Sequence, residues 1–142
     1  TYILTARVKG RVTAARLELL TDETLPHRGP GRQDNGNLHL SEFSVSAGKS
    51  LKVRAATADF DQTGWTVRHA IDGNPATAWG IYPEVGKPHT AVFELAEPFV
   101  AEAEADLTFK LEQLHGSGHL IGRFRLSVTD AAPPLKPSVL PA

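Results

Sequence analysis

The chain of 142 residues contains no cysteine and no methionine. Without cysteine, disulfides, zinc–thiolate sites, iron–sulfur clusters and thiol nucleophiles are all excluded within it. No apolar run approaches the roughly 20 residues that a membrane-spanning helix needs, so we expect no membrane segment. Because methionine is missing at position 1 and no apolar leader follows, we expect Thr1 to continue a longer preceding chain that would carry any export signal.

An excess of positive charge is missing as well. The 15 Lys and Arg residues are balanced by 16 Asp and Glu, which gives a formal net charge of −1. This balance lacks the broad basic surface that binding to a nucleic-acid backbone requires, so we expect no nucleic-acid partner and no membrane partner. Apolar residues make up 41% and charged residues 22% of the chain, which is typical of an ordinary folded domain.

Apolar residues alternate with polar ones more often than they recur at helical spacing, and this predicts strands. The clearest strands are expected at 107–112 and 123–128, and others at 2–8, 15–20, 38–47, 51–56 and 89–95. Seven or more short strands predict an all-β sandwich or barrel. The only helical piece expected is a turn or two at 66–71. We expect one core that includes Leu17, Leu19, Val92, Phe93, Phe109, Leu111, Phe124, Leu126 and Val128.

Two segments are too rich in Gly, Pro and polar residues to be strands. Residues 21–37 form an unusually long loop, which in an ordered domain is often functional. Residues 131–142 contain four prolines and are expected to form an extended linker. The predicted organisation is therefore one domain at 1–130, followed by a Pro-rich linker at 131–142.

The segment 70–79, AIDGNPATAW, places a carboxylate, an amide and a hydroxyl in one tight turn. Calcium prefers six to eight oxygen ligands, which such a turn can supply from backbone carbonyls and from Asp72 and Thr77. The alternative is a turn capped by the side chain of Asp72, without a metal.

A second feature concerns Glu42. Along 38–45 the apolar residues change from even to odd positions, with Ser41 and Glu42 at the change, and a β-bulge would explain the switch. If the even phase extends to Glu42, its carboxylate faces inward and needs a cation or a set of donors. The alternative places Glu42 at a solvated strand edge.

Both segments resemble known sequences. AIDGNPATAW and LSEF (40–43) are similar to signatures of discoidin-like, galactose-binding domains, which include many carbohydrate-binding modules. The resemblance implies a jelly-roll β-sandwich with a structural calcium ion. The ligands that it implies are Glu42, Ala70, Asp72, Asn74 and Thr77. LSEF here precedes the turn instead of closing the domain, which a circular permutation would explain.

Over 12–129 the chain also resembles a domain embedded in large exported planctomycete proteins that carry cytochrome c-like modules. This resemblance implies an exported location, periplasmic or extracellular, and neighbouring domains of the same parent chain as partners. It implies no haem function here, because the chain has no haem attachment motif.

Few aromatic residues are available to bind a sugar. Trp65 lies in a predicted loop, and a flat indole beside hydrogen-bond donors suits a pyranose ring. The residues expected to face a carbohydrate are Trp65, Tyr82, Arg32, Asn35 and His69. The alternatives are a Trp65 that folds back over its loop and an ordinary turn at Asn35. Trp79 is expected to pack beneath the turn at 70–79.

No catalytic motif is complete. The glycine-rich segment 29–37 has no Gly-Lys-Ser/Thr, and Ser117 between two glycines lacks the nucleophile-elbow pattern. His115 and His119 have a zinc-ligand spacing, but the glycines between them disfavour the helix that this spacing needs. We therefore expect a non-enzymatic domain that recognises a polysaccharide. The alternative is a structural module that docks against neighbouring domains or other proteins.

Overall fold

The computed structural model describes residues 1–138, in which strands supply nearly all regular structure. The strands are β1 (Tyr2–Leu19), β2 (Glu42–Ser46), β3 (Ser50–Leu51), β4 (Val53–Ala58), β5 (His89–Glu112) and β6 (Phe124–Thr129). Two short 3-10 turns accompany them, η1 (Pro26–Arg28) and η2 (Val67–Ile71). The predicted all-β class is confirmed, and so is the helical turn expected at 66–71, whereas η1 was not predicted. No helix within residues 1–138 has the length and apolar character to cross a membrane.

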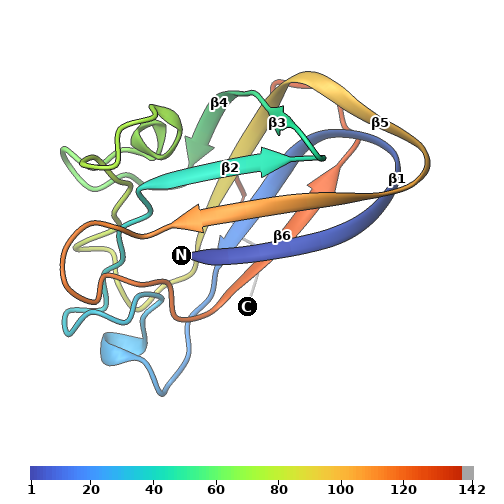
Figure 1. Cartoon of the computed structure of the whole chain (residues 1–142). Coiled ribbons are helices and arrows are strands. Elements are labelled where there is room, and N and C mark those ends of the chain that lie inside the picture. Colours follow the sequence, from blue (N-terminus) through green and yellow to red (C-terminus); the bar gives the residue numbers. More distant parts are fainter. Residues whose placement is uncertain (139–142) are drawn as a thin grey trace.

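All strand pairs are antiparallel, in the order β3-β2-β5-β1-β6, and β4 also pairs with β5. β1 and β5 are long, and they bend together (Figure 1). The part of this ladder that pairs 2–8 with 105–111 is extended on the β5 side by β2 and then β3. The part that pairs 14–19 with 89–94 is flanked by β6 and β4. The bend therefore divides one ladder into the two layers of a sandwich.

The bend coincides with irregular pairing in β1. The register to β5 shifts between Val8 and Gly10 and again between Val12 and Ala14. Gly10 has a φ of +89°, a conformation that costs glycine little. The sequence predicts separate strands at 2–8 and 15–20, whereas the structure joins them into β1, and β5 likewise continues beyond the predicted strands at 89–95 and 107–112.

The predicted strand at 38–47 is wrong in its first half, because β2 begins only at Glu42. Leu40 lies outside the strand and forms an isolated bridge with Trp79. The change in apolar parity therefore marks the junction between a buried loop and a strand, and no bulge is needed. Phe43 and Val45 face the core, so Glu42 lies on the opposite face of β2.

The core lies between the two layers. Phe43 of β2 stacks on Phe93 of β5 with 3.9 Å between ring centroids, and Leu17, Leu19 and Phe93 are fully buried. Of the predicted core residues, Leu17, Leu19, Phe93, Phe109 and Leu111 are buried in this cluster, and Phe124 and Leu126 pack against it half-buried. Val128 is 38% exposed, contrary to expectation, because β6 is an edge strand.

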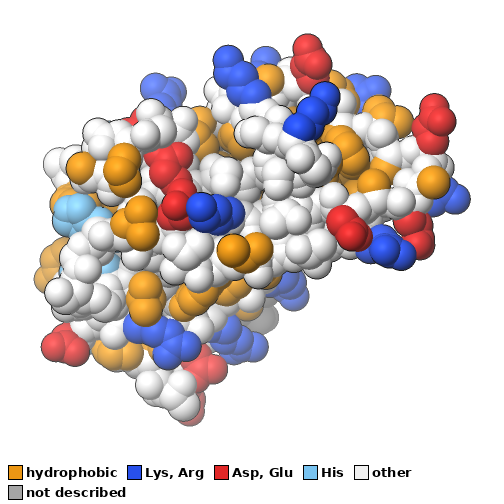
Figure 2. All heavy atoms as spheres, in the orientation of Figure 1, with side chains coloured by type: hydrophobic (Ala, Val, Ile, Leu, Met, Phe, Trp, Pro, Cys, Tyr) orange, Lys and Arg blue, Asp and Glu red, His pale blue; other side chains and the backbone are white. Residues whose placement is uncertain are grey.

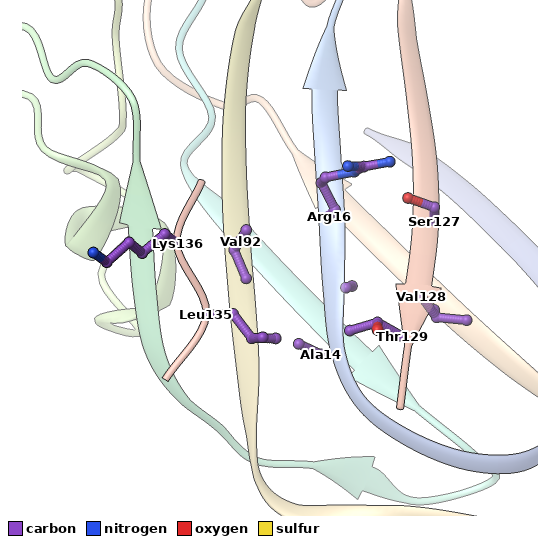
Figure 3. A pocket seen from close by; sticks show the side chains of 9 residues that line it. Ala14, Arg16, Val92, Ser127, Val128, Thr129, Leu135 and Lys136 are labelled. Atoms are coloured by element: carbon purple, nitrogen blue, oxygen red, sulfur yellow. The ribbon is translucent and has the colours of Figure 1, made fainter. Parts of the chain in front are cut away.

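Val92 is buried but does not belong to this core cluster. It lines a cavity of about 310 Å³ with Ala14, Leu135 and Lys136 (Figure 3). Thr13 fixes the start of the tail, since its hydroxyl donates a 2.6 Å hydrogen bond to the carbonyl of Ala131. Residues 131–138 of the predicted linker have no regular structure and run back towards the sheet, and the last residues of that linker lie outside the described residues.

Candidate binding site at the loop end

Three loops meet at one end of the sandwich, at the left in Figure 1. They are residues 20–41, 59–88 and 113–123, and short backbone pairings connect them. The amide of His39 donates to the carbonyl of His119 (3.0 Å), and the amide of Gly80 donates to the carbonyl of Trp65 (3.0 Å). Gly31 passes so close to the backbone that a Cβ there would lie 1.8 Å from the Asn37 carbonyl oxygen. Residues far apart in sequence are thus held together.

These loops place an aromatic stack at the end of the molecule. The His39 ring lies parallel to Trp65 (centroids 4.3 Å apart) and parallel to His119 (4.1 Å). Two rings cannot both stack at that distance on the same face of one imidazole, so they cover its opposite faces. His39 is accordingly only 5% exposed, whereas Trp65 and His119 are half-buried. Histidine side chains are visible at this end in Figure 2.

His115 lies beside this stack. Its ring is edge-on to His39 (5.0 Å) and to Trp65 (4.6 Å). Because these two distances are similar to the 4.3 Å between His39 and Trp65, His115 flanks both rings instead of covering the outer face of the indole. Neither His39 nor His115 occupies that outer face.

Asn37 sets the proton positions in the stack. Its side-chain Oδ1 accepts hydrogen bonds from the backbone amides of Ile81 (3.0 Å) and Tyr82 (3.2 Å), which can only donate. The orientation of the amide is therefore fixed, and Nδ2 donates to Oε1 of Gln62 (3.0 Å) and faces Nε2 of His39 (3.4 Å). Nε2 of His39 must then be an acceptor, and the ring hydrogen lies on Nδ1.

That hydrogen has a partner. Nδ1 of His39 lies 3.2 Å from Nδ1 of His115 and donates to it. A second proton on His39 would face the Asn37 amide group, which also donates, so the network favours neutral His39. In agreement, burial, followed by the neighbouring His119 and His115, lowers the pKa of His39 to about 4. Burial also lowers the pKa of His119.

The structure separates the residues predicted to face a carbohydrate. Trp65 belongs to the stack, and Tyr82 is 45% exposed and connected to the same network through its amide. Arg32 is exposed, and its amide bonds the carbonyl of Leu120 (2.7 Å). Asn35 caps its own turn by accepting the amide of Asn37. His69 accepts the amide of Thr66 at the start of η2, on the side of the turn at 70–79.

His39 and Gln62 are functional candidates that sequence reasoning missed, and His115 and His119 were considered there only as zinc ligands. The one signal available was the HGSGH spacing at 115–119. Within residues 1–138, no three His, Cys, Asp or Glu side chains gather in a metal-binding arrangement. Asn37 also opposes a metal on Nδ1 of His39, because the ring hydrogen would then move to Nε2 and face another donor.

The turn at 70–79 begins in the last residues of η2. Both carboxylate oxygens of Asp72 accept hydrogen bonds, Oδ1 from the Asn74 amide (2.9 Å) and Oδ2 from the Thr77 hydroxyl (2.6 Å). The side chain of Asn74 accepts the amide of Ala76, so it is already used within the turn. Ala70 is fully buried, as is Trp79 beneath the turn, where its indole donates to the carbonyl of Phe60.

Glu42 faces this turn from β2. Burial and then the adjacent Asp72 raise the pKa of Glu42 to about 7, although the amides of Gly73 and Asn74 act in the opposite direction. Oε1 of Glu42 is buried and has no hydrogen-bond partner among the described residues. Desolvation raises the pKa of Asp72, but the hydrogen bonds from Thr77 and Asn74 keep it below its usual range, so Glu42 takes up a proton before Asp72 as the pH falls.

Carboxylate oxygens are the ligands that a hard cation such as calcium prefers, and here two carboxylates lie together, one of them with an unsatisfied buried oxygen. Of the five predicted calcium ligands, Glu42 and Asp72 are brought together, and Thr77 contacts Asp72. Any further oxygen ligands would have to come from backbone carbonyls, because the Asn74 side chain is engaged.

Comparisons with known proteins add no further constraint on this site. No family model, no curated protein and no solved structure matches the chain.

Proposed function

We propose that this chain is a non-catalytic polysaccharide-binding domain of a larger exported protein, with the loop end as its binding surface. The discoidin-like, galactose-binding resemblance of 40–43 and 70–79 supports the class. The observation that carries the proposal is the half-buried Trp65, whose indole is held by His39 on one face and left uncovered by both His39 and His115 on the other. A rigid aromatic face beside ring N–H groups suits a pyranose.

A calcium ion between Glu42, Asp72 and Thr77 belongs to the same proposal. The turn continues from η2, and η2 packs against β2 and β4. A cation there would neutralise the two carboxylates and fix the chain that leads out of the Trp65 loop. Its contribution is structural, and no chemical step is assigned to it.

Replacement of Trp65 by Ala tests the binding surface. We expect Trp65→Ala to reduce retention on a binding polysaccharide in affinity electrophoresis. The expected loss of binding free energy is about 1–3 kcal/mol, because the apolar area of the indole is what the ligand would cover. Trp65→Phe keeps a smaller aromatic face and should retain part of the binding.

Val100→Ala is the matched control, because Val100 is an apolar side chain that is 61% exposed on β5, in the bend at the opposite end of the long strands from the loops. It should bind like the wild type. Melting curves of all variants separate lost binding from lost folding. A folded Trp65→Ala domain with unchanged retention would exclude this surface, and a wild-type domain that no polysaccharide in a broad panel retains would exclude the function.

One observation favours the docking module as a second candidate. The tail residues Leu135 and Lys136 already line a cavity with Ala14 and Val92 on the outer face of the sheet (Figure 3). Under this alternative, a domain shortened to residues 1–130 should bind the separate peptide 131–142, and Val92→Asp should abolish that binding. Polysaccharide retention should not respond to either change.

A further inference from the structure

The loop end presents hydrogen-bond donors from several aromatic rings. His115 contacts His39 through Nδ1, whereas its Nε2 has no partner among residues 1–138 and is not a buried atom. The indole nitrogen of Trp65 likewise has no hydrogen-bond partner among residues 1–138 and is not a buried atom. The side-chain acceptors at the centre of the network, Oδ1 of Asn37 and Oε1 of Gln62, are already occupied.

The hydrogen-bond chain determines which form of His115 faces the solvent. Two backbone amides orient Asn37, Asn37 makes Nε2 of His39 an acceptor, and Nδ1–H of His39 donates to Nδ1 of His115. A neutral imidazole whose Nδ1 accepts must carry its hydrogen on Nε2. His115 therefore presents a donor at Nε2, which is not buried, and its ring lies beside that of Trp65.

From this arrangement we propose that the site recognises an anionic, acceptor-only group, the carboxylate or sulfate of an acidic polysaccharide, with His115 as the specificity-determining residue. The inference rests on the proposed function. A neutral hydroxyl both donates and accepts, so part of its hydrogen-bonding capacity would find no partner at these ring donors, whereas an anionic oxygen only accepts. Hydrogen bonds to a charged acceptor are also about twice as strong as neutral ones.

Arg32 supplies a positive charge on the same end. Its amide bonds the carbonyl of Leu120, and Leu120 follows His119 of the stack. The Arg32 side chain is exposed and forms no ion pair with any residue in 1–138. A guanidinium without an internal carboxylate partner is available to an external one.

Two substitutions of His115 separate its two nitrogens. Asn places its amide where Nδ1 lies and has nothing at the Nε2 position, so His115→Asn keeps the contact to His39 and loses the outward donor. Gln reaches the Nε2 position, so His115→Gln keeps an outward donor. We expect His115→Asn to weaken binding of an acidic polysaccharide about tenfold or more, and His115→Gln to retain most of it. A merely structural role for His115 would not produce this order in variants with equal melting temperatures.

The probes are de-esterified pectin, the same pectin with its carboxylates methyl-esterified, and a sulfated galactan, each in affinity electrophoresis at fixed ionic strength. Preference for de-esterified over esterified pectin, or for the sulfated chain, supports the inference and identifies the anion. Equal or tighter binding of neutral polysaccharides overturns it and leaves the proposed function intact. Absence of binding to every polysaccharide overturns both.

Nitrogen NMR of the histidine rings tests the hydrogen-bond chain without any ligand. Long-range ¹H–¹⁵N spectra at neutral pH should show His39 with its hydrogen on Nδ1 and His115 with its hydrogen on Nε2. A hydrogen on Nδ1 of His115 would refute the donor assignment, whatever the sugar results.

Discussion

At the scale of single residues, Asn37 determines more of the site than its size suggests. Asn37 is only 2% exposed. Its carboxamide accepts from the backbone amides of Ile81 and Tyr82, donates to Gln62 and faces His39. Buried polar networks of this kind are costly when one member is left unpaired. The chemistry that Trp65 and His115 present therefore depends on a residue that no ligand would touch.

His39 gives the loop end a predictable dependence on pH. Its pKa in the folded protein is about 4, whereas an unperturbed histidine titrates near 6.5, so the unfolded chain takes up the proton first as the pH falls. The stabilisation from neutral His39 is complete above about pH 6.5 and is lost between about pH 6.5 and 4, by up to about 3 kcal/mol. The pKa of His119 is also lowered, so His119 likewise contributes stability that is lost as the pH falls.

Urea unfolding followed between about pH 7.5 and pH 4 measures this loss. His39→Gln is the control, because a Gln carbonyl can accept from Asn37 but does not titrate, and its stability should decrease less over the same window. An equal decrease in both proteins would show that His39 is not the responsible group. His89 changes stability in the opposite direction. Burial lowers its pKa, but its hydrogen bonds with Asp59 and Glu84 raise the pKa overall. The stability that a raised histidine pKa contributes is lost as the pH rises, not as it falls.

At the scale of elements, alternation predicts which residues face the core better than where strands end. The pattern at 107–112 correctly places Phe109 and Leu111 inside, because side chains of a strand alternate between its two faces. The same pattern at 123–128 misplaces Val128, since alternation does not reveal that β6 is an edge strand. The continuity of β1 through Gly10 is also invisible in the sequence, because the bend is imposed by pairing with β5.

The junction of β2 with the turn at 70–79 yields the calcium prediction. A cation that binds only the folded state stabilises it, by about 2.7 kcal/mol at a concentration one hundred times its dissociation constant. Chelation should therefore lower the melting temperature, and added calcium should restore it. Glu42→Gln should abolish this response, because it removes the carboxylate with the buried, unpartnered Oε1.

Glu112→Gln is the matched control for the calcium experiment. Glu112 is the register partner of Glu42 on β5, but its carboxylate pairs with Lys110 at 3.3 Å. This variant should keep the calcium response of the wild type. Melting curves that coincide in chelator and in calcium would remove the ion from the proposal and leave a proton shared by Glu42 and Asp72 as the reason for their contact.

At the scale of the whole molecule, the candidate site illustrates the limit of sequence reasoning. Glu42 and Asp72 are thirty positions apart, and only the resemblance of LSEF and AIDGNPATAW to a calcium-binding family predicts that they approach each other. They do lie adjacent in the structure. Nothing comparable indicates that His39, Trp65, His115 and His119 form one cluster. They come from three loops, and their contacts depend on how the sandwich closes.

The way in which the two layers are joined predicts that the molecule unfolds as one unit. β1 and β5 run through both layers, and the stacked rings of Phe43 and Phe93 join the layers across the core. Phe93→Ala should therefore cost about 3–5 kcal/mol, a large share of a typical domain stability, whereas Val128→Ala on the exposed edge should cost far less. Tryptophan fluorescence reports the loop end and far-ultraviolet circular dichroism reports the strands. For both variants the two signals should follow one urea transition, and separate transitions would mean that the layers fold independently despite the strands they share.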